Sequence, residues 1–218
     1  QDHQFVSLAS PEGSVLEGVT AGDNPSPSDA PADAEFPVGF LEFAVTALAP
    51  GSATTLEIFL PEGTVANQYL KYGPEPGNPT PHWYAFTYDG TTGAEFLSDR
   101  IVLHFVDGQR GDHDLSANGV IDDPGAPVLV PDADGDGIDD LIDTCPQSDL
   151  RGVIWIDGRD SGVANELLPD GCSLADLIEE TLAQPGEGNA EIVSLLLEWK
   201  SEDLISGREM GSILKEIN

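Results

Sequence analysis

An acidic loop that begins at Asp132 carries the residues whose types and spacing are best suited to chemistry. Within Asp132–Asp143, carboxylates occupy positions 1, 3, 5, 9 and 12, and glycine occupies position 6. This is the spacing of an EF-hand calcium loop, in which position 7 offers a backbone carbonyl. The spacing predicts a calcium site with these ligands: Asp132, Asp134, Asp136, the carbonyl of Ile138, Asp140 and Asp143.

The loop differs from the EF-hand template at its last position. Asp143 has a shorter side chain than the glutamate usual there, so the loop need not close as an EF-hand does. Without a cation, the crowded carboxylates would repel one another. The alternative interpretation is a solvated acidic linker.

The same stretch resembles a known calcium-binding motif. Residues Asp132 to Pro146 follow the pattern Asp-x-Asp-Gly-Asp-Gly-x-x-Asp-x-x-Asp-x-Cys-Pro. This pattern is similar to a single thrombospondin type 3 repeat, a motif common in secreted proteins, and the resemblance implies bound Ca2+. The tandem array usual in such proteins is missing, so a long calcium-wrapped stalk is not implied.

A second group of oxygen donors precedes this loop. Asp112, Asp114, Asn118 and Asp122 lie in a glycine-punctuated stretch and form a candidate second metal site. Their spacing fits no calcium template, and Asx-turn hydrogen bonds in a loop account for them equally well. Both interpretations stay open at this point.

The charge balance restricts the partners of the chain. Of its 218 residues, 40 are acidic and 8 are basic, which gives a formal net charge of −32. Such a charge argues against nucleic acid and anionic membranes as partners, because both are polyanions. Such a charge suits a protein that works in the presence of calcium or salt, because the charge is then bound or screened. No apolar run approaches the roughly 18 residues of a membrane span, so direct membrane insertion is not expected.

The two cysteines, Cys145 and Cys172, bear on the compartment. An even cysteine count in a chain that looks secreted favours a disulfide, worth about 3 kcal/mol for a loop of moderate length. Two free thiols are the alternative. The start at Gln1 is typical of a mature N-terminus after signal-peptide cleavage. We therefore expect an extracellular protein, either secreted or associated with a cell surface.

Alternating apolar residues separated by turns predict a mainly β fold. About seven or eight short strands before residue 107 indicate an antiparallel β-sandwich over residues 1–128. The calcium loop is expected within residues 129–150, and a small helical domain within residues 151–218. In that last part, Ser173 is a candidate N-cap for a helix. Two further helices are expected over 190–200 and 208–217, with Trp155 or Trp199 packed between them.

A second resemblance covers the predicted sandwich, from about residue 4 to residue 127. It is carried by Phe36-Pro37-Val38-Gly39-Phe40, Leu60-Pro61-Glu62-Gly63, Tyr88-Asp89-Gly90-Thr91-Thr92-Gly93-Ala94 and Leu103-His104-Phe105-Val106-Asp107-Gly108. These segments are similar to the bacterial choice-of-anchor U domain, whose members are exported surface proteins with no assigned biochemical activity. The helical end resembles a tail seen downstream of thrombospondin type 3 motifs in secreted bacterial proteins.

No motif for catalysis is present. The chain lacks Gly-x-Ser-x-Gly, His-Glu-x-x-His and a phosphate-binding glycine loop. The sequence therefore predicts a non-catalytic, calcium-stabilised structural protein of a bacterial surface, which self-assembles as a surface-layer or filament subunit. Its partners would be calcium and copies of itself or other surface proteins. An adhesin or glycan-binding module, with His82-Trp83-Tyr84 and Tyr88 on its binding face, and an accessory domain of a secreted hydrolase are the alternatives.

Overall fold

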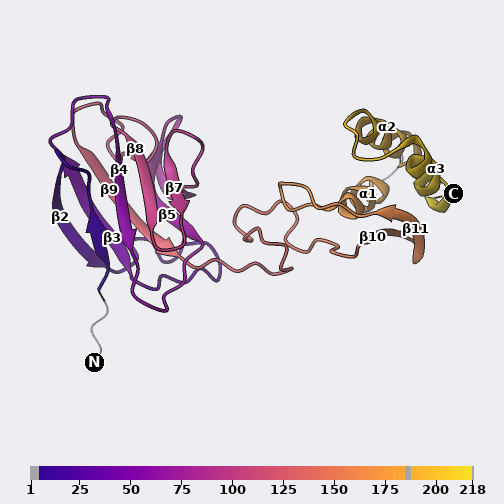
Figure 1. Cartoon of the computed structure of the whole chain (residues 1–218), viewed down its shortest axis with the longest axis horizontal. Helices are drawn as coiled ribbons and strands as arrows, with labels where there is room; N and C mark the ends of the chain where they lie inside the picture. Colours follow the sequence, from indigo (N-terminus) through magenta and orange to yellow (C-terminus); the bar gives the residue numbers. More distant parts are fainter. Residues whose placement is uncertain (1–4, 185–187, 218) are drawn as a thin grey trace. The chain divides into compact units, whose positions relative to one another are not determined.

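The computed structural model describes residues 5–184 and 188–217, and it divides into two compact units. The N-terminal unit ends at Pro131 and the C-terminal unit begins at Asp132. The acidic loop and the helices that follow it therefore belong to one compact unit. Figure 1 shows the strands of the first unit and the helices of the second.

The N-terminal unit consists of two antiparallel sheets. One has the strand order β1-β4-β8-β7 and the other the order β2-β3-β9-β5-β6. The strands are β1 Ser7–Ala9, β2 Val15–Gly22, β3 Phe40–Thr46, β4 Ala53–Phe59, β5 Gln68–Glu75, β6 Asn78–Ala85, β7 Gly93–Phe96, β8 Ile101–Val106 and β9 Ile121–Val128.

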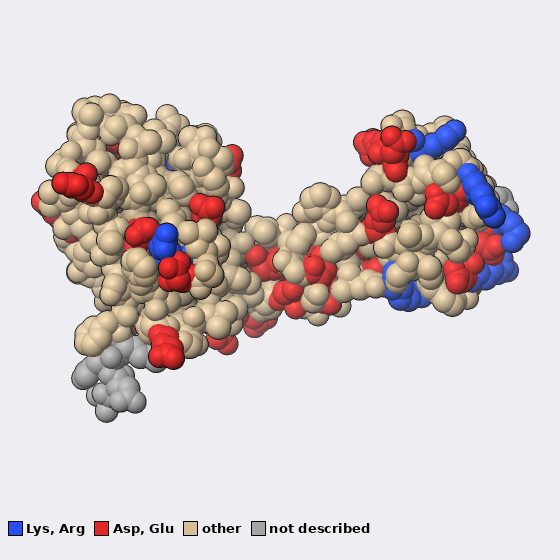
Figure 2. All heavy atoms as spheres, viewed as in Figure 1, with Lys and Arg blue, Asp and Glu red and all other residues tan. Residues whose placement is uncertain are grey.

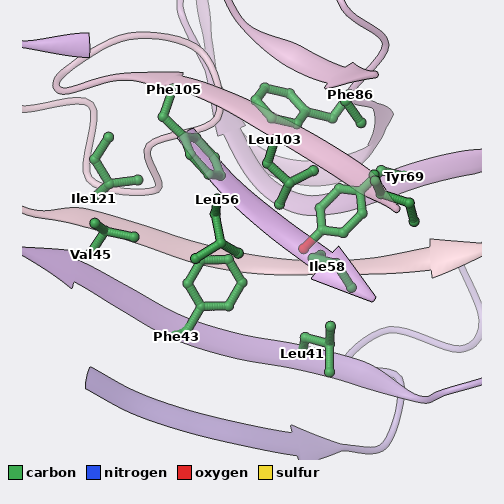
Figure 3. Packing of buried hydrophobic residues seen from close by; sticks show 12 residues of the cluster. Leu41, Phe43, Val45, Leu56, Ile58, Tyr69, Phe86, Leu103, Phe105 and Ile121 are labelled. Carbon is green, nitrogen blue, oxygen red and sulfur yellow. The ribbon is translucent and has the colours of Figure 1, made fainter. Parts of the chain in front are cut away.

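Alternate residues of these strands meet in one core, which confirms the predicted sandwich (Figure 3). On β3, Leu41, Phe43 and Val45 are buried, whereas Glu42 between them is exposed. The opposite sheet contributes Leu56, Ile58, Ile101, Leu103 and Phe105 to the same cluster. Burying one face of each sheet is what holds the two layers together.

Strand β9 was not expected from the sequence, although it lies at the centre of the five-stranded sheet. Its Asp122-Asp123-Pro124-Gly125 stretch is typical of a turn. The prolines are tolerated because β3 pairs with Ile121–Gly125 and β5 with Gly125–Val128. Pro124 is paired only with Glu42 of β3 and Pro127 only with Tyr69 of β5, so each proline has one side without a partner strand.

The C-terminal unit combines a β-hairpin with three helices. The elements are β10 Val153–Ile156, β11 Arg159–Ala164, α1 Leu174–Ala183, α2 Gly188–Ser201 and α3 Gly207–Ile217. Their shared cluster contains Ile154, Leu174, Ile192, Trp199 and Ile213. The sequence-based expectation of a helical domain thus lacked the hairpin. Of the two candidate tryptophans, Trp199 is buried, whereas Trp155 is 38% exposed.

Helix α1 begins as predicted. The Ser173 hydroxyl accepts from the backbone N–H of Asp176, and the Asp176 carboxylate accepts from the N–H of Ser173. This capping box satisfies two donors of the first turn and fixes where the helix starts. The sequence also predicts a helix break over residues 185–188, of which residues 185–187 lie outside the described residues. None of the described helices has the length and apolarity needed to cross a membrane.

Candidate metal centre

Three aspartates at the start of the acidic loop bring their carboxylates together. One oxygen each from Asp132, Asp134 and Asp136 lies within 4.8 Å of the others. Among the described residues, this is the group of three or more His, Cys, Asp or Glu side chains that could hold a metal ion. Carboxylate oxygens are the ligands preferred by hard cations such as Ca2+ and Mg2+. The arrangement can therefore bind a divalent cation.

Backbone N–H groups of the loop orient these carboxylates. Asp132 accepts from the N–H of Gly135 at 2.8 Å and of Gly137 at 3.1 Å. Asp136 accepts from the N–H of Ile138 at 2.7 Å, which fixes the peptide at position 7. Gly135 and Gly137 have φ values of +79° and +97°, a conformation that glycine adopts without steric cost. The glycines thus let the chain curl around its own aspartates.

The carboxylates of Asp140 and Asp143, two further predicted ligands, lie outside the close group of three. Asp140 accepts from the N–H of Ala133 at 2.8 Å, so it ties the end of the loop to its beginning. Asp143 accepts from the N–H of Cys145 at 2.7 Å. Burial raises the pKa of Asp143, and the carboxylates of Asp136, Asp134 and Asp140 raise it further. Asp143 therefore lies within the electrostatic reach of the other loop carboxylates.

Two buried oxygens support the fit of a cation. Oδ2 of Asp136 and Oδ2 of Asp143 are shielded from solvent and have no hydrogen-bond partner within the part of the chain that the structure describes. A buried carboxylate oxygen without a donor costs free energy, because it has lost its hydration. A bound divalent cation would satisfy such oxygens directly.

The disulfide lies directly beside the loop and is confirmed. Cys145 and Cys172 are bonded at a sequence separation of 27, with their Cα atoms 4.9 Å apart. Ser148 joins the two features: its N–H donates to Oδ2 of Asp134 at 2.6 Å, and its hydroxyl donates to the carbonyl of Gly171. A disulfide is typical of an oxidising compartment.

Ser148 and Gly171 were not identified from the sequence. A serine and a glycine carry no ligand signal, and their role depends on contacts across the disulfide. At Gly171, a Cβ atom would overlap the carboxylate of Asp143, and φ is +89°. Glycine at this position leaves room for the last carboxylate of the loop.

Acidic side chains dominate the surface around this centre. Figure 2 shows them along the segment that carries the loop, with Lys and Arg gathered elsewhere on the same unit. With a formal charge of −32 on the chain, the surrounding potential attracts cations.

In the candidate second metal site, the carboxylate oxygens of Asp112 and Asp114 accept hydrogen bonds from nearby residues. Asp112 is 1% exposed and accepts from the N–H groups of Gly108 and Asp122. Asp114 accepts from the N–H of Ser116 and from the side-chain amide of Asn118. These are the turn-type hydrogen bonds that the sequence left as an alternative. The carboxylate of Asp122 is exposed and carries no such contact with the other three.

The sequence also contains an integrin-type tripeptide, Arg110-Gly111-Asp112, whose residues are buried or half-buried in the sandwich. Arg110 pairs with Glu75 at 3.1 Å and donates to the carbonyl of Ala85 at 2.6 Å. Gly111 and Asp112 are buried. The tripeptide is therefore engaged in internal contacts.

Comparison with known proteins yields no relative: no family model, curated protein or solved structure matches this chain. The resemblances to the choice-of-anchor U domain and the thrombospondin type 3 repeat therefore stay predictions from the sequence.

Proposed function

We propose that the chain is a non-catalytic, calcium-stabilised structural protein of an extracellular bacterial surface. The observation that carries this proposal is the convergence of Asp132, Asp134 and Asp136 within 4.8 Å, beside a disulfide. Calcium is favoured over magnesium because six or more oxygen ligands with flexible geometry suit it, whereas Mg2+ holds several of its waters. The ion would act by stabilising the fold.

The stabilising role follows from linkage. A cation that binds the folded loop and not the unfolded chain adds stability, about 2.7 kcal/mol when its concentration is 100 times the dissociation constant. Cation binding would stabilise the C-terminal unit, which contains both the loop and the helices. Its hairpin and three short helices have a small core, so this addition matters.

Limited proteolysis tests the stabilising role. We expect cleavage after Arg151 and Arg159, both in the C-terminal unit, to be slow in calcium and fast in a chelator. Cleavage after Arg100 in the sandwich serves as the internal control and should not change. Equal cleavage of the C-terminal unit in both conditions would contradict the proposal.

Self-assembly is part of the same proposal. One route to assembly is donation of residues 5–9 as a strand to a neighbouring subunit, although Ser7–Ala9 pairs here with Glu57–Phe59 of its own chain. Exchange between subunits would require that strand to leave β4 and enter the same position in a neighbour. Electron microscopy with and without calcium tests the idea, and monomers alone in both conditions would refute it.

A glycan-binding function is the second candidate, favoured by a groove of about 450 Å3 in the sandwich. The groove is lined by aromatic rings from Phe40 and Tyr72 and by carboxylates from Glu42 and Asp122. Aromatic faces pack on sugar rings, and carboxylates accept from sugar hydroxyls. A glycan array probed with the wild-type protein and with the Tyr72→Ala variant tests this candidate. Glycan binding by Tyr72→Ala equal to that of the wild type would refute the groove as the site.

A further inference from the structure

The five-stranded sheet holds a lysine and an aspartate in direct contact inside the core. Lys71 on β5 and Asp123 on β9 form an ion pair, and their side chains are 1% and 0% exposed. In the antiparallel register of these neighbouring strands, Lys71 lies opposite Gly125. Asp123 is therefore offset by two residues on the same face of the sheet. Both residues belong to the N-terminal unit, whereas the acidic loop belongs to the C-terminal unit.

Aromatic rings enclose the lysine amine. Its Nζ lies 5.1 Å from the ring centroid of Phe86 and 5.0 Å from that of Phe105. It also donates to the carbonyl oxygen of Gly111 at 2.5 Å. Figure 3 shows both phenylalanines within the sandwich core. The amine is thus fixed in position in an apolar environment that keeps water away.

Tyr69 holds the second oxygen of the Asp123 carboxyl group. The Tyr69 hydroxyl donates to Oδ2 of Asp123 at 2.5 Å, while Lys71 contacts Oδ1. Burial raises the pKa of Tyr69 well above its usual value, and the nearby Asp123 raises it further. The phenol therefore keeps its proton and polarises the carboxyl group towards attack at Cγ.

Burial favours the neutral form of the Lys71 amine. Desolvation lowers the pKa of Lys71, against the opposing effect of Asp123. Taking two full charges out of water is costly, and direct contact must offset that cost. Proton transfer within the pair gives an uncharged amine beside an uncharged carboxylic acid. An uncharged amine is the nucleophilic form of lysine.

We propose that Lys71 and Asp123 are a modification site, at which the two side chains condense to an intramolecular amide. The lone pair of Nζ attacks Cγ of Asp123 and forms the N–C bond. The C–O bond to Oδ1 then breaks, and Oδ1 leaves as water with its own proton and one from the amine. The carbonyl oxygen, Oδ2, stays hydrogen-bonded to Tyr69. The reaction is a condensation, so no oxidant or reductant is required.

The amide would join two neighbouring strands covalently. It closes a loop between residues 52 apart in the sequence, and such cross-links stabilise by restricting the unfolded chain. A surface-exposed protein that must survive proteases and mechanical load gains from this link. The inference goes beyond the cation proposal and does not depend on it.

Peptide mapping by tandem mass spectrometry tests the link in the full-length chain. Trypsin cuts after an unmodified Lys71, whereas an acylated lysine resists cleavage. After reduction of the disulfide, the linked protein should yield a branched species in which residues 1–100 are joined to residues 111–151, lighter by one water than its two parts. Free peptides ending at Lys71 as the only product, with an intact mass that lacks only the disulfide hydrogens, would overturn the proposal.

Controls separate the amide from other losses of water. Succinimide formation at Asp-Gly sequences also removes one water, so the branched peptide and not the intact mass decides. Lys71→Arg keeps the positive charge but cannot form this amide, and it should give no branched species. Tyr69→Phe keeps the ring and removes the hydroxyl, and we expect a lower linked fraction. Complete linkage in Tyr69→Phe would overturn the role given to Tyr69.

Discussion

Gly171 lies directly against the carboxylate of Asp143, so the residue before Cys172 has no space for a side chain. Asp143 is also held by the N–H of Cys145, the other half of the disulfide. The last carboxylate of the acidic loop is thus positioned from both ends of one covalent link.

Substituting Gly171 should weaken cation binding. Gly171→Ala places a Cβ on the Asp143 carboxylate and forces a side chain into φ +89°, at a cost of about 1–2 kcal/mol. We expect a lower unfolding temperature and a smaller calcium-dependent increase in it, measured by calorimetry. Gly152→Ala is the matched control, because nothing lies within 4 Å of its Cβ. Equal effects of the two substitutions would contradict the role of Gly171.

Removing the disulfide should destabilise the C-terminal unit and its cation site together. Loss of a native disulfide costs about 2–5 kcal/mol. In the Cys145→Ala/Cys172→Ala variant we expect a lower calcium affinity, because Asp143 and Ser148 are both positioned beside the bond. Titration calorimetry on the oxidised protein and on the double variant measures the difference. Identical affinities would show that the site forms without the link.

The stability of the sandwich should depend on pH through Asp107. Burial raises the pKa of this carboxylate, but backbone N–H groups of Gly51, Gly119, Asn118 and Val120 outweigh burial and lower it. An acid whose pKa is lowered on folding stabilises the fold above its unfolded pKa. That contribution is lost as the pH falls through the lower, folded value.

The Asp107→Asn variant isolates this contribution. It removes the ionised acceptor, and we expect a loss of about 1–3 kcal/mol at neutral pH. The loss should shrink as the pH falls below about 3.8, the ordinary pKa of an aspartate side chain. Denaturant unfolding at a series of pH values, with the exposed Asp99→Asn as control, measures it. A loss that is constant across the acid range would count against this account.

The sequence was informative where local pattern decides structure. The sandwich strands other than β9, the helix start at Ser173 and the single disulfide were predicted from spacing and composition. Each depends on nearby residues or, for the disulfide, on the presence of two cysteines alone.

Long-range contacts account for what the sequence missed. Asp123 resembled part of a turn because its partners, Lys71 and Tyr69, lie more than fifty residues away. Ser148 and Gly171 support the loop through folded geometry and have no motif of their own. Asp112 and Asp114 have the residue type of ligands, but Asp112 accepts from two backbone N–H groups and Asp114 from a backbone N–H and the side-chain amide of Asn118.

Isothermal titration with calcium is the most direct test of the central claim. The oxidised wild-type protein should show a binding event that is absent from Asp134→Ala and from Asp136→Ala, because both carboxylates belong to the group of three. Glu202→Gln removes a negative charge from an exposed position of the same unit and should bind as wild type does. Wild-type binding that persists in both aspartate variants would contradict the site.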